Sequence, residues 1–281
     1  MTTAPTIARR WELFPVAPST IICVFILVVF AVAAVASPWI SPHDPSLVTR
    51  NILQPPSSEH WFGTDNLGRD VFSGVLRGAS NSMVIGASVG LIAFLIGVTI
   101  GSFSGFVGGR VDAVFMQVAA FFQVMPSFIL ALVAVAILGR STVLVIAVLS
   151  ITQWSDLARI VRAQYLTIRS STYVEAAHAA GLSKLHIAVR EILPNAISPV
   201  IVAATLNVGS AILLESGLSF LGLGDANNPS WGEMLNRAQP YLSRAWWMSV
   251  FPGAAIFLVV VSINFIGDAL NHALDPQNRA R

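Results

Sequence analysis

Charged residues are missing from six long intervals of this chain, and these intervals constrain its fold more than any other feature. The charged residues that bound them are Glu12 and Asp44, Arg77 and Arg110, Asp112 and Arg140, Arg140 and Asp156, Glu191 and Glu215, and Arg244 and Asp268. A helix that crosses a bilayer needs about 20 mostly apolar residues, and a charge at its centre costs roughly 2.5–3.5 kcal/mol. The intervals therefore predict membrane-spanning helices.

The fold class that follows is all-α, a polytopic membrane bundle of six transmembrane helices. We expect these helices at residues 19–40, 82–105, 113–138, 141–159, 197–220 and 246–267. Composition supports this expectation, because only 11% of the residues are charged and the mean hydropathy is +0.73. Soluble domains carry about 25% charged residues, so the composition disfavours an ordinary soluble enzyme.

The distribution of basic residues predicts the orientation of the bundle. With the N-terminus inside, ten of the sixteen Lys and Arg residues fall in inner segments and six in outer ones, which favours an N-in, C-in topology. We divide the chain into an inner tail (1–18), a first span with an outer loop (19–81), a core of five spans (82–270) and an inner tail (271–281). An alternative for the first span is a cleaved signal peptide ending at Ala34-Val35-Ala36, but the apolar run continues through Trp39 and Ile40.

Scarce residue types exclude several kinds of site. Lys184 is the only lysine and follows Gly-Leu-Ser, so the chain has no nucleotide-binding P-loop. Cys23 is the only cysteine, which excludes a disulfide framework and a cysteine-based metal cluster. The pI of about 9.1 reflects few charges with a small excess of arginine, not a nucleic-acid-binding surface. We therefore expect no nucleotide, metal or nucleic acid on this chain itself.

A row of glycines marks one face of the second expected span. The row consists of Gly86, Gly90, Gly97, Gly101 and Gly105. Glycines four or seven residues apart lie on one face of a helix and let a second helix approach closely in lipid. This face therefore predicts helix packing, either in an interface that moves or in ordinary bundle contacts. In the third expected span, Pro126 predicts a kink.

The inner loop between the fourth and fifth spans carries the most specific pattern. We expect the fourth span to continue as a helix to about residue 170, and a short helix over VEAAHAA to follow. Gly181 is suited to end that helix, and Ser183 to cap a second one that runs to about Leu193, before Pro194. Such a polar hairpin has little core of its own, so its exposed Ala and Leu side chains predict docking on another protein.

The spacing of this loop resembles the EAA loop of ABC-importer permeases. Glu175, Ala176, Ala177 and Gly181 fall in register, and Leu193-Pro194 closes the motif at the expected distance. One departure is that Glu191 stands at the family's usual isoleucine position, with Ile192 one residue later. The prediction of docking therefore does not extend to the contact that Glu191 itself makes.

Three further segments resemble the dipeptide/oligopeptide/nickel group of these permeases, in particular its C-type subunit. They are FGTDNLGRDVFS (62–73), LESGLSFLGLG with PSWGEML (214–224 and 229–235), and INFIGDALNHALDP (263–276). Gly74 and Ser80 occupy positions where the group commonly has arginine, which weakens any prediction of charge contacts there.

The resemblance implies a type I importer permease in a bacterial inner membrane, working with a second permease, two cytoplasmic ATPase subunits and an extracytoplasmic binding protein. The EAA loop would be the coupling helix that docks in a groove of the ATPase. Glu175 would pair with a basic group there or cap the helix, Ala176 and Ala177 would permit close approach, and Gly181 would set the turn before Leu182. ATP and Mg²⁺ would bind the partner subunits. The cargo would be a di- or oligopeptide or a related small solute such as a nickel chelate.

Other polar residues leave alternatives open. Glu215, near the outer end of the fifth span, predicts either a contact of the translocation path, with Asn207 and Ser210, or an interfacial carboxylate paired with Arg237 or Arg244.

The alternative functions of the chain are an intramembrane enzyme and an ATP-independent channel. The enzyme is disfavoured because no His lies in an expected span, and because the G-x-S-x-G match at 86–90 lies inside a span, not on a strand-to-helix turn.

The remaining histidines and the outer aspartates are expected to have simple roles. His178 and His186 flank Gly181, so a metal pair is disfavoured. His43 and His60, in the outer loop, are expected to be solvated.

Asp65 and Asp70 flank a Gly-Arg turn and predict turn capping more than metal binding.

Overall fold

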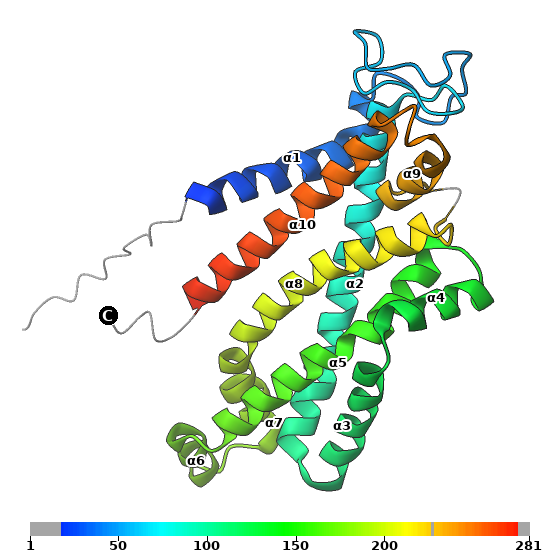
Figure 1. Cartoon of the computed structure of the whole chain (residues 1–281). Helices are drawn as coiled ribbons and strands as arrows, with labels where there is room; N and C mark the ends of the chain where they lie inside the picture. The colour runs from blue at the N-terminus through cyan, green and yellow to red at the C-terminus, as the bar shows by residue number, and fades with distance from the viewer. Residues whose placement is uncertain (1–17, 226–227, 275–281) are drawn as a thin grey trace, which may run out of the picture.

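The computed structural model describes residues 18–225 and 228–274 and is built almost entirely of helices (Figure 1). The α-helices are α1 (Pro18–Ile40), α2 (Val71–Val107), α3 (Gly109–Val124), α4 (Ser127–Leu138), α5 (Thr142–Arg169), α6 (Thr172–Ala179), α7 (Lys184–His186), α8 (Leu193–Phe220), α9 (Trp231–Ala238) and α10 (Trp247–Leu274). A π-helix (Ile187–Ile192) joins α7 to α8, and a 3₁₀ turn (Gln239–Tyr241) follows α9. No β-strand occurs in the described ranges. Both expected tails fall largely outside them, including Arg9, Arg10, Arg279 and Arg281.

Five helical segments are long and apolar enough to cross a membrane, and the bent pair α3–α4 makes a sixth crossing when counted as one span. Each expected span coincides with one of these segments, so the prediction of an all-α membrane bundle is confirmed, with six crossings when α3–α4 is counted as one. The helices extend well beyond the charge-free intervals. For example, α2 begins at Val71, eleven residues before the expected start, and includes Arg77. A charge-free interval marks the part of a helix that lies in lipid, and helices continue into the polar layers on either side.

The third span is broken, not merely kinked. The axes of α3 and α4 differ by 85° at the two residues between them. Met125 is extended, with φ −82° and ψ 127°, and Pro126 precedes the first turn of α4. Proline disfavours the helical conformation of the residue before it and lacks the N–H that would continue the helix. The expected effect of Pro126 was therefore in the right place but too small.

The contacts of α2 fix the path of the chain. Gly97 faces Leu157 and Gly105 faces Tyr165, so α2 and α5 run in the same direction. The chain must cross back between them, and α3–α4 is the only connecting segment. At the far end of that crossing, Thr142 donates hydrogen bonds from its N–H and Oγ1 to Asp225, which follows α8. The α3–α4 pair therefore connects opposite ends of the bundle.

The two ends of the molecule differ in character. We call the end with residues 41–70 and α9 the outer end, and the end with α6 and α7 the inner end, following the predicted orientation (Figure 1). Helix α8 runs antiparallel to α2, since Gly86 contacts Ile212 and Gly90 contacts Val208. Helices α1 and α10 pack side by side on this core.

Candidate functional site

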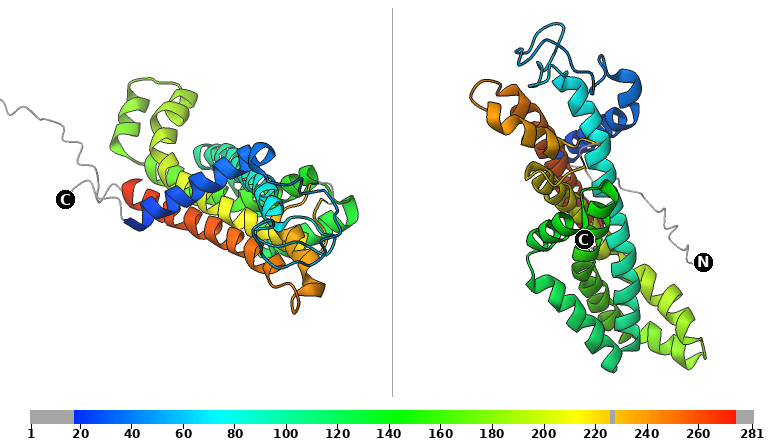
Figure 2. Two further views of the ribbon diagram at one scale, coloured as in Figure 1. Left: turned by 90° about the horizontal axis from the view of Figure 1, so that it is seen from above. Right: turned by 90° about the vertical axis from the view of Figure 1, so that its right-hand side faces the viewer.

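A helical hairpin projects from the inner end of the bundle. It consists of α6, a turn at residues 180–183, α7 and the π-helix, and both views in Figure 2 show it standing out from the other helices. As predicted, α5 continues to Arg169 and Ser183 caps the following helix, accepting a hydrogen bond from the His186 N–H at 3.3 Å. Ser171 occupies the N-cap position of α6, although its hydroxyl donates to the Ile168 carbonyl at 2.7 Å instead of capping.

The turn of the hairpin depends on Gly181. Its φ is +78°, a conformation that residues with a side chain rarely adopt. Its N–H bonds the His178 carbonyl at 3.0 Å, and the Leu182 N–H bonds the Ala177 carbonyl at 3.2 Å, which closes the C-terminus of α6. The sequence placed this glycine correctly.

The prediction that the second short helix stops before Pro194 is wrong. Lys184 to Phe220 form one continuous helical segment, in which the π-helix precedes α8. Pro194 lies at the junction of the π-helix with α8, where Leu193 before it still donates its N–H to the Ala188 carbonyl, so the helical segment continues through the proline. The hairpin is therefore joined to a transmembrane helix without a loop.

One face of the hairpin is anchored to the bundle. Val174, Ile187 and Ile192 are completely buried and belong to the apolar cluster that contains the inner half of α5. The buried Tyr165 hydroxyl donates to the Ala188 carbonyl at 2.9 Å. Because anchors come from α6 and from the π-helix, the hairpin is held to α5 and α8 as one unit.

The opposite face is open. Glu175 and Ala176 are exposed, Ala177 is half-buried and Pro194 is exposed. Three apolar side chains of the hairpin are exposed at the inner end of the bundle: Leu182 (39%), Leu185 (74%) and Val189 (50%). Clustered apolar side chains that protrude from the bundle are typical of a protein interaction site. Glu191, at the family's usual isoleucine position, is half-exposed, whereas the side chain of Ile192 is buried. The apolar contact expected of that isoleucine is therefore made by Ile192, one residue later.

The glycine row of α2 lies against two different helices. All five glycines are buried. A Cβ added at Gly97 would lie 2.6 Å from the Leu157 Cβ, and one at Gly105 would lie 2.7 Å from the Tyr165 Cβ. Gly86 and Gly90 contact α8, whereas Gly97, Gly101 and Gly105 contact α5. The row therefore brings α5, which leads into the hairpin, close to α2.

Glu215 lies inside the chain. It is 2% exposed, and its Oε1 accepts a hydrogen bond from the Ser219 hydroxyl at 2.6 Å. It is not the partner of Arg237, which pairs with Glu233 at 3.2 Å. Asn207 is half-buried and Ser210 is exposed. Glu215 is thus more buried than either of these two residues, and the role of the three in a path stays a prediction.

At the outer end, residues 41–70 form a loop with no long regular element. Asp65 accepts hydrogen bonds from the N–H groups of Leu67 and Arg69, at 2.8 and 2.9 Å. Asp70 caps α2 by accepting from the Ser73 N–H at 2.8 Å. The predicted capping roles of both aspartates are therefore present.

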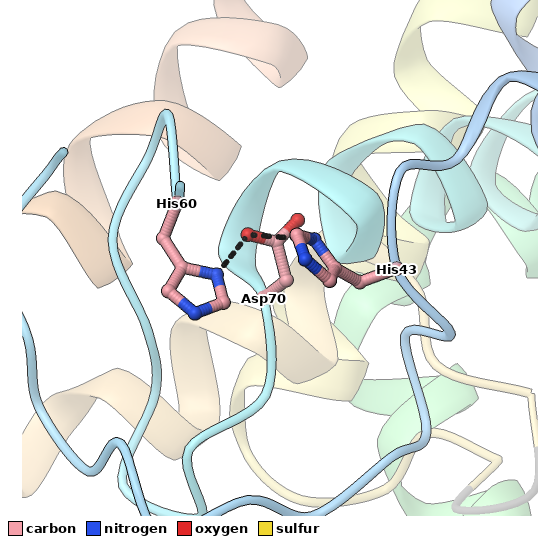
Figure 3. A group of neighbouring side chains, drawn as sticks. All are labelled: His43, His60 and Asp70. Carbon is pink, nitrogen blue, oxygen red and sulfur yellow. Dashed lines mark hydrogen bonds and ion pairs between the residues drawn. The ribbon is translucent and has the colours of Figure 1, made fainter. Parts of the chain in front are cut away.

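The expectation that His60 is solvated is wrong. His60 is 4% exposed, and its Nδ1 lies 2.9 Å from Asp70 Oδ1 (Figure 3). His43, whose side chain is 37% exposed, lies beside it, with ring centroids 4.9 Å apart. The three residues are separated by 17 and 10 positions, a spacing that matches no common motif. Sequence reasoning missed this cluster because only the fold of the loop brings it together.

A cleft of about 700 Å³ opens beside this loop. Its lining includes His43, Arg69, Arg77 and Arg237. The cleft lies between the loop and the segment that leads into α9, at the outer end.

Comparison with known proteins identifies the family. Residues 97–280 match the family described as binding-protein-dependent transport system inner membrane component. The chain belongs to this family. It is 40% identical over 263 residues to the probable D,D-dipeptide transport system permease protein DdpC of Escherichia coli, covering 92% of this chain and 88% of that protein. It is 42% identical over 260 residues to the dipeptide transport system permease protein DppC of Bacillus subtilis (91% and 81%), and 38% identical over 258 residues to the oligopeptide permease OppC of the same organism (90% and 84%).

Family membership makes this chain a multi-pass membrane permease subunit, as the sequence predicted. Neither alternative, an intramembrane enzyme or an independent channel, gains support from these similarities. The permease family is a component of larger transport systems, so the exposed face of the hairpin belongs to a protein that works with other subunits.

Proposed function

We propose that this chain is one of two permease subunits of an ATP-driven importer of short peptides in a bacterial cytoplasmic membrane. The names of its relatives, which are dipeptide, D,D-dipeptide and oligopeptide permeases, support a peptide cargo. An extracytoplasmic binding protein delivers the peptide at the outer end, and two cytoplasmic subunits bind ATP and Mg²⁺ and hydrolyse the nucleotide. This chain binds neither and performs no chemistry of its own.

One observation carries the proposal: the hairpin has an anchored face and an exposed apolar face. Leu182, Leu185 and Val189 lose contact with water when they enter a groove of the ATPase, which favours docking. Glu175 and Ala176, exposed on α6, lie at the same interface, where the small side chain of Ala176 permits close approach. Half-buried Ala177 lies between the docked surface and the bundle.

The anchored face of the hairpin would transmit movement of the docked ATPase to the transmembrane helices. Val174 and Ile192 hold the hairpin to the inner half of α5 and α8, and Leu193-Pro194 continue directly into α8. When ATP closes the ATPase dimer, the hairpin moves with it and carries these helices, because packed elements shift as rigid bodies. Movement of α5 and α8 relative to the second permease would open the path to the inner side.

The experiment uses the four-subunit transporter purified from membranes. We expect Leu185→Asp to reduce copurification of the ATPase subunits severely, since a carboxylate would be desolvated in the groove. Leu47→Asp is the matched control, because Leu47 is 56% exposed at the outer end. Intact subunit association in Leu185→Asp, or equal losses in both variants, would contradict the docking role.

Coupling is tested separately from assembly. Gly181→Asp and Ala177→Asp are expected to insert into the membrane normally but to abolish peptide uptake and the rise in ATP hydrolysis that a loaded binding protein causes. Normal uptake by both variants would refute coupling through this loop. Uptake that continues without the ATPase subunits would instead support a channel.

A further inference from the structure

The outer loop places two imidazoles and one carboxylate around a common point. His43 comes from the start of the loop, His60 from its middle, and Asp70 from the N-terminus of α2 (Figure 3). Their potential ligand atoms all lie within 4.8 Å of one another. The three side chains therefore converge from segments that only the folded loop brings together.

We propose that His43, His60 and Asp70 form a binding site for a divalent transition-metal ion of the zinc type on the outer end of this subunit. Two imidazole nitrogens and one carboxylate oxygen are ligands that suit Zn²⁺, whereas Ca²⁺ and Mg²⁺ prefer sites made of oxygen atoms alone. The site lies at the opposite end of the bundle from the hairpin (Figure 1).

The distances fit an ion after a small movement. In tetrahedral Zn²⁺ sites the bonds to nitrogen and oxygen are about 2.0–2.2 Å, which puts ligand atoms about 3.3–3.5 Å apart. His60 Nδ1 is 2.9 Å from Asp70 Oδ1, and His43 Nδ1 is 3.9 Å from the same oxygen. One separation is slightly shorter and the other slightly longer than the ion requires.

His43 is the ligand that can move. Its backbone N–H is held by the Ser73 hydroxyl at 3.3 Å, whereas its side chain is 37% exposed and has no hydrogen bond in the described part of the chain that fixes the ring. Asp70 is fixed by its capping bond to Ser73, and buried His60 is held by Asp70. Two ligands are thus preorganised, and the third is adjustable.

The Nδ1 atom of His43 gives an independent reason to expect a ligand. This atom is buried and has no hydrogen-bond partner within the described residues. Buried polar atoms are nearly always satisfied by a hydrogen bond, a water or an ion. A metal ion shared with Asp70 and His60 would satisfy it, and the cleft lined by His43 would supply a water as the fourth ligand.

An ion at this point would tie together a segment that has little regular structure. It would link residue 43, residue 60 and the first turn of α2 in a loop held mainly by turns and isolated hydrogen bonds. The negative charge of Asp70 offsets the unfavourable position of a cation near a helix N-terminus. The consequence is an outer loop whose order depends on metal.

The test compares metal content and stability of the assembled transporter, purified with an affinity tag that contains no histidine. Each preparation is stripped with a chelator, titrated with Zn²⁺ and assayed for bound zinc and thermal midpoint, with Co²⁺ absorption as a probe of the ligand set. His43→Ala is the main variant, because it leaves the His60–Asp70 bond and the helix cap in place. Asp70→Asn keeps a capping oxygen but removes the charge, and His178→Ala, exposed at the inner end, is the control.

We expect wild type and His178→Ala each to bind one more zinc ion per permease chain than His43→Ala does. Wild type and His178→Ala should also gain thermal stability when Zn²⁺ is added. Loss of a partner in the outer shell of a metal site lowers affinity roughly 10–100-fold, so loss of the ligand His43 should lower it at least tenfold. Asp70→Asn should behave like His43→Ala. Equal zinc binding by wild type and His43→Ala would overturn the proposal. A variant midpoint that is lower but rises with Zn²⁺ as in wild type would also overturn it, since the cluster would then act through hydrogen bonds alone.

Discussion

At the residue scale, the buried glycines of α2 allow α5 to approach closely. A Cβ at Gly97 would lie 2.6 Å from the Leu157 Cβ and 3.1 Å from the Ala158 backbone nitrogen, so Gly97→Ala forces the two helices apart. We expect it to destabilise the chain by about 1–3 kcal/mol, the usual cost of overpacking, despite the better helix propensity of alanine. The thermal midpoint of the purified transporter would report the change.

Gly253→Ala is the matched control for this prediction. Gly253 is also helical, but a Cβ there meets nothing within 4 Å in the described chain. This variant should be neutral or more stable by up to about 1 kcal/mol, since alanine favours the helix. Equal effects of the two substitutions would show that the α2–α5 contact is looser than the distances indicate.

Single residues differ in how far the sequence reveals their role. Gly181 was predictable because a turn after a short helix has a local signature, and its φ of +78° fits that signature. His60 was not predictable, because its side-chain contacts are with residues 10 and 17 positions away along an irregular loop. Glu215 differs from His60, because its partner Ser219 lies one helical turn away and could be read from the sequence, whereas its burial could not.

At the scale of helices, one ion pair sets the position of α3 at the inner end. The guanidinium of Arg162 in α5 donates two bonds to Asp112 in α3, at 2.8 and 2.6 Å, and the Ser104 hydroxyl in α2 donates to the same carboxylate. We expect Asp112→Asn to destabilise the chain by about 1–2 kcal/mol, because an amide cannot accept both guanidinium bonds. Limited proteolysis near the 108–110 turn, together with thermal midpoints, would measure this.

Two comparisons make that prediction specific. Arg162→Lys should give an intermediate loss, since an ammonium keeps the charge but not the two-bond geometry. Arg110→Gln, at a neighbouring exposed position, should leave stability and cleavage unchanged. If Asp112→Asn matched Arg110→Gln, the ion pair would contribute nothing to the placement of α3.

The sequence predicted the helices better than their ends and breaks. Lipid excludes charge, so charge-free intervals located every span, but helices such as α2 continue past the bilayer where charge is tolerated. Pro126 was recognised as a perturbation, yet the 85° change of direction depends on how α4 packs against α5 and α8. The local sequence did not predict the π-helix before α8, in which Ile187 and Ile192 are completely buried.

At the scale of the whole molecule, the parallel course of α2 and α5 fixes how the chain is threaded. Both helices end at the hairpin side, so α3 and α4 together must return the chain to the side of the outer loop. The turn before α5 lies there, since Thr142 bonds Asp225 after α8. The hairpin and the His43–His60–Asp70 cluster consequently lie on opposite sides of the membrane, where an ATPase and a binding protein would each have access to only one of them.

This threading predicts a labelling pattern with single cysteines. In a Cys23→Ser background, which removes the one native cysteine, Ser58→Cys and Arg140→Cys should react with a membrane-impermeant maleimide added to cells whose outer layers are opened. Leu185→Cys, in the hairpin, should react only after the membrane is permeabilised. All three positions are exposed, so differences in reactivity report the side of the membrane. Arg140→Cys is decisive: if it reacted only after permeabilisation, as Leu185→Cys does, α3–α4 would be a re-entrant loop and the six-crossing topology would be wrong.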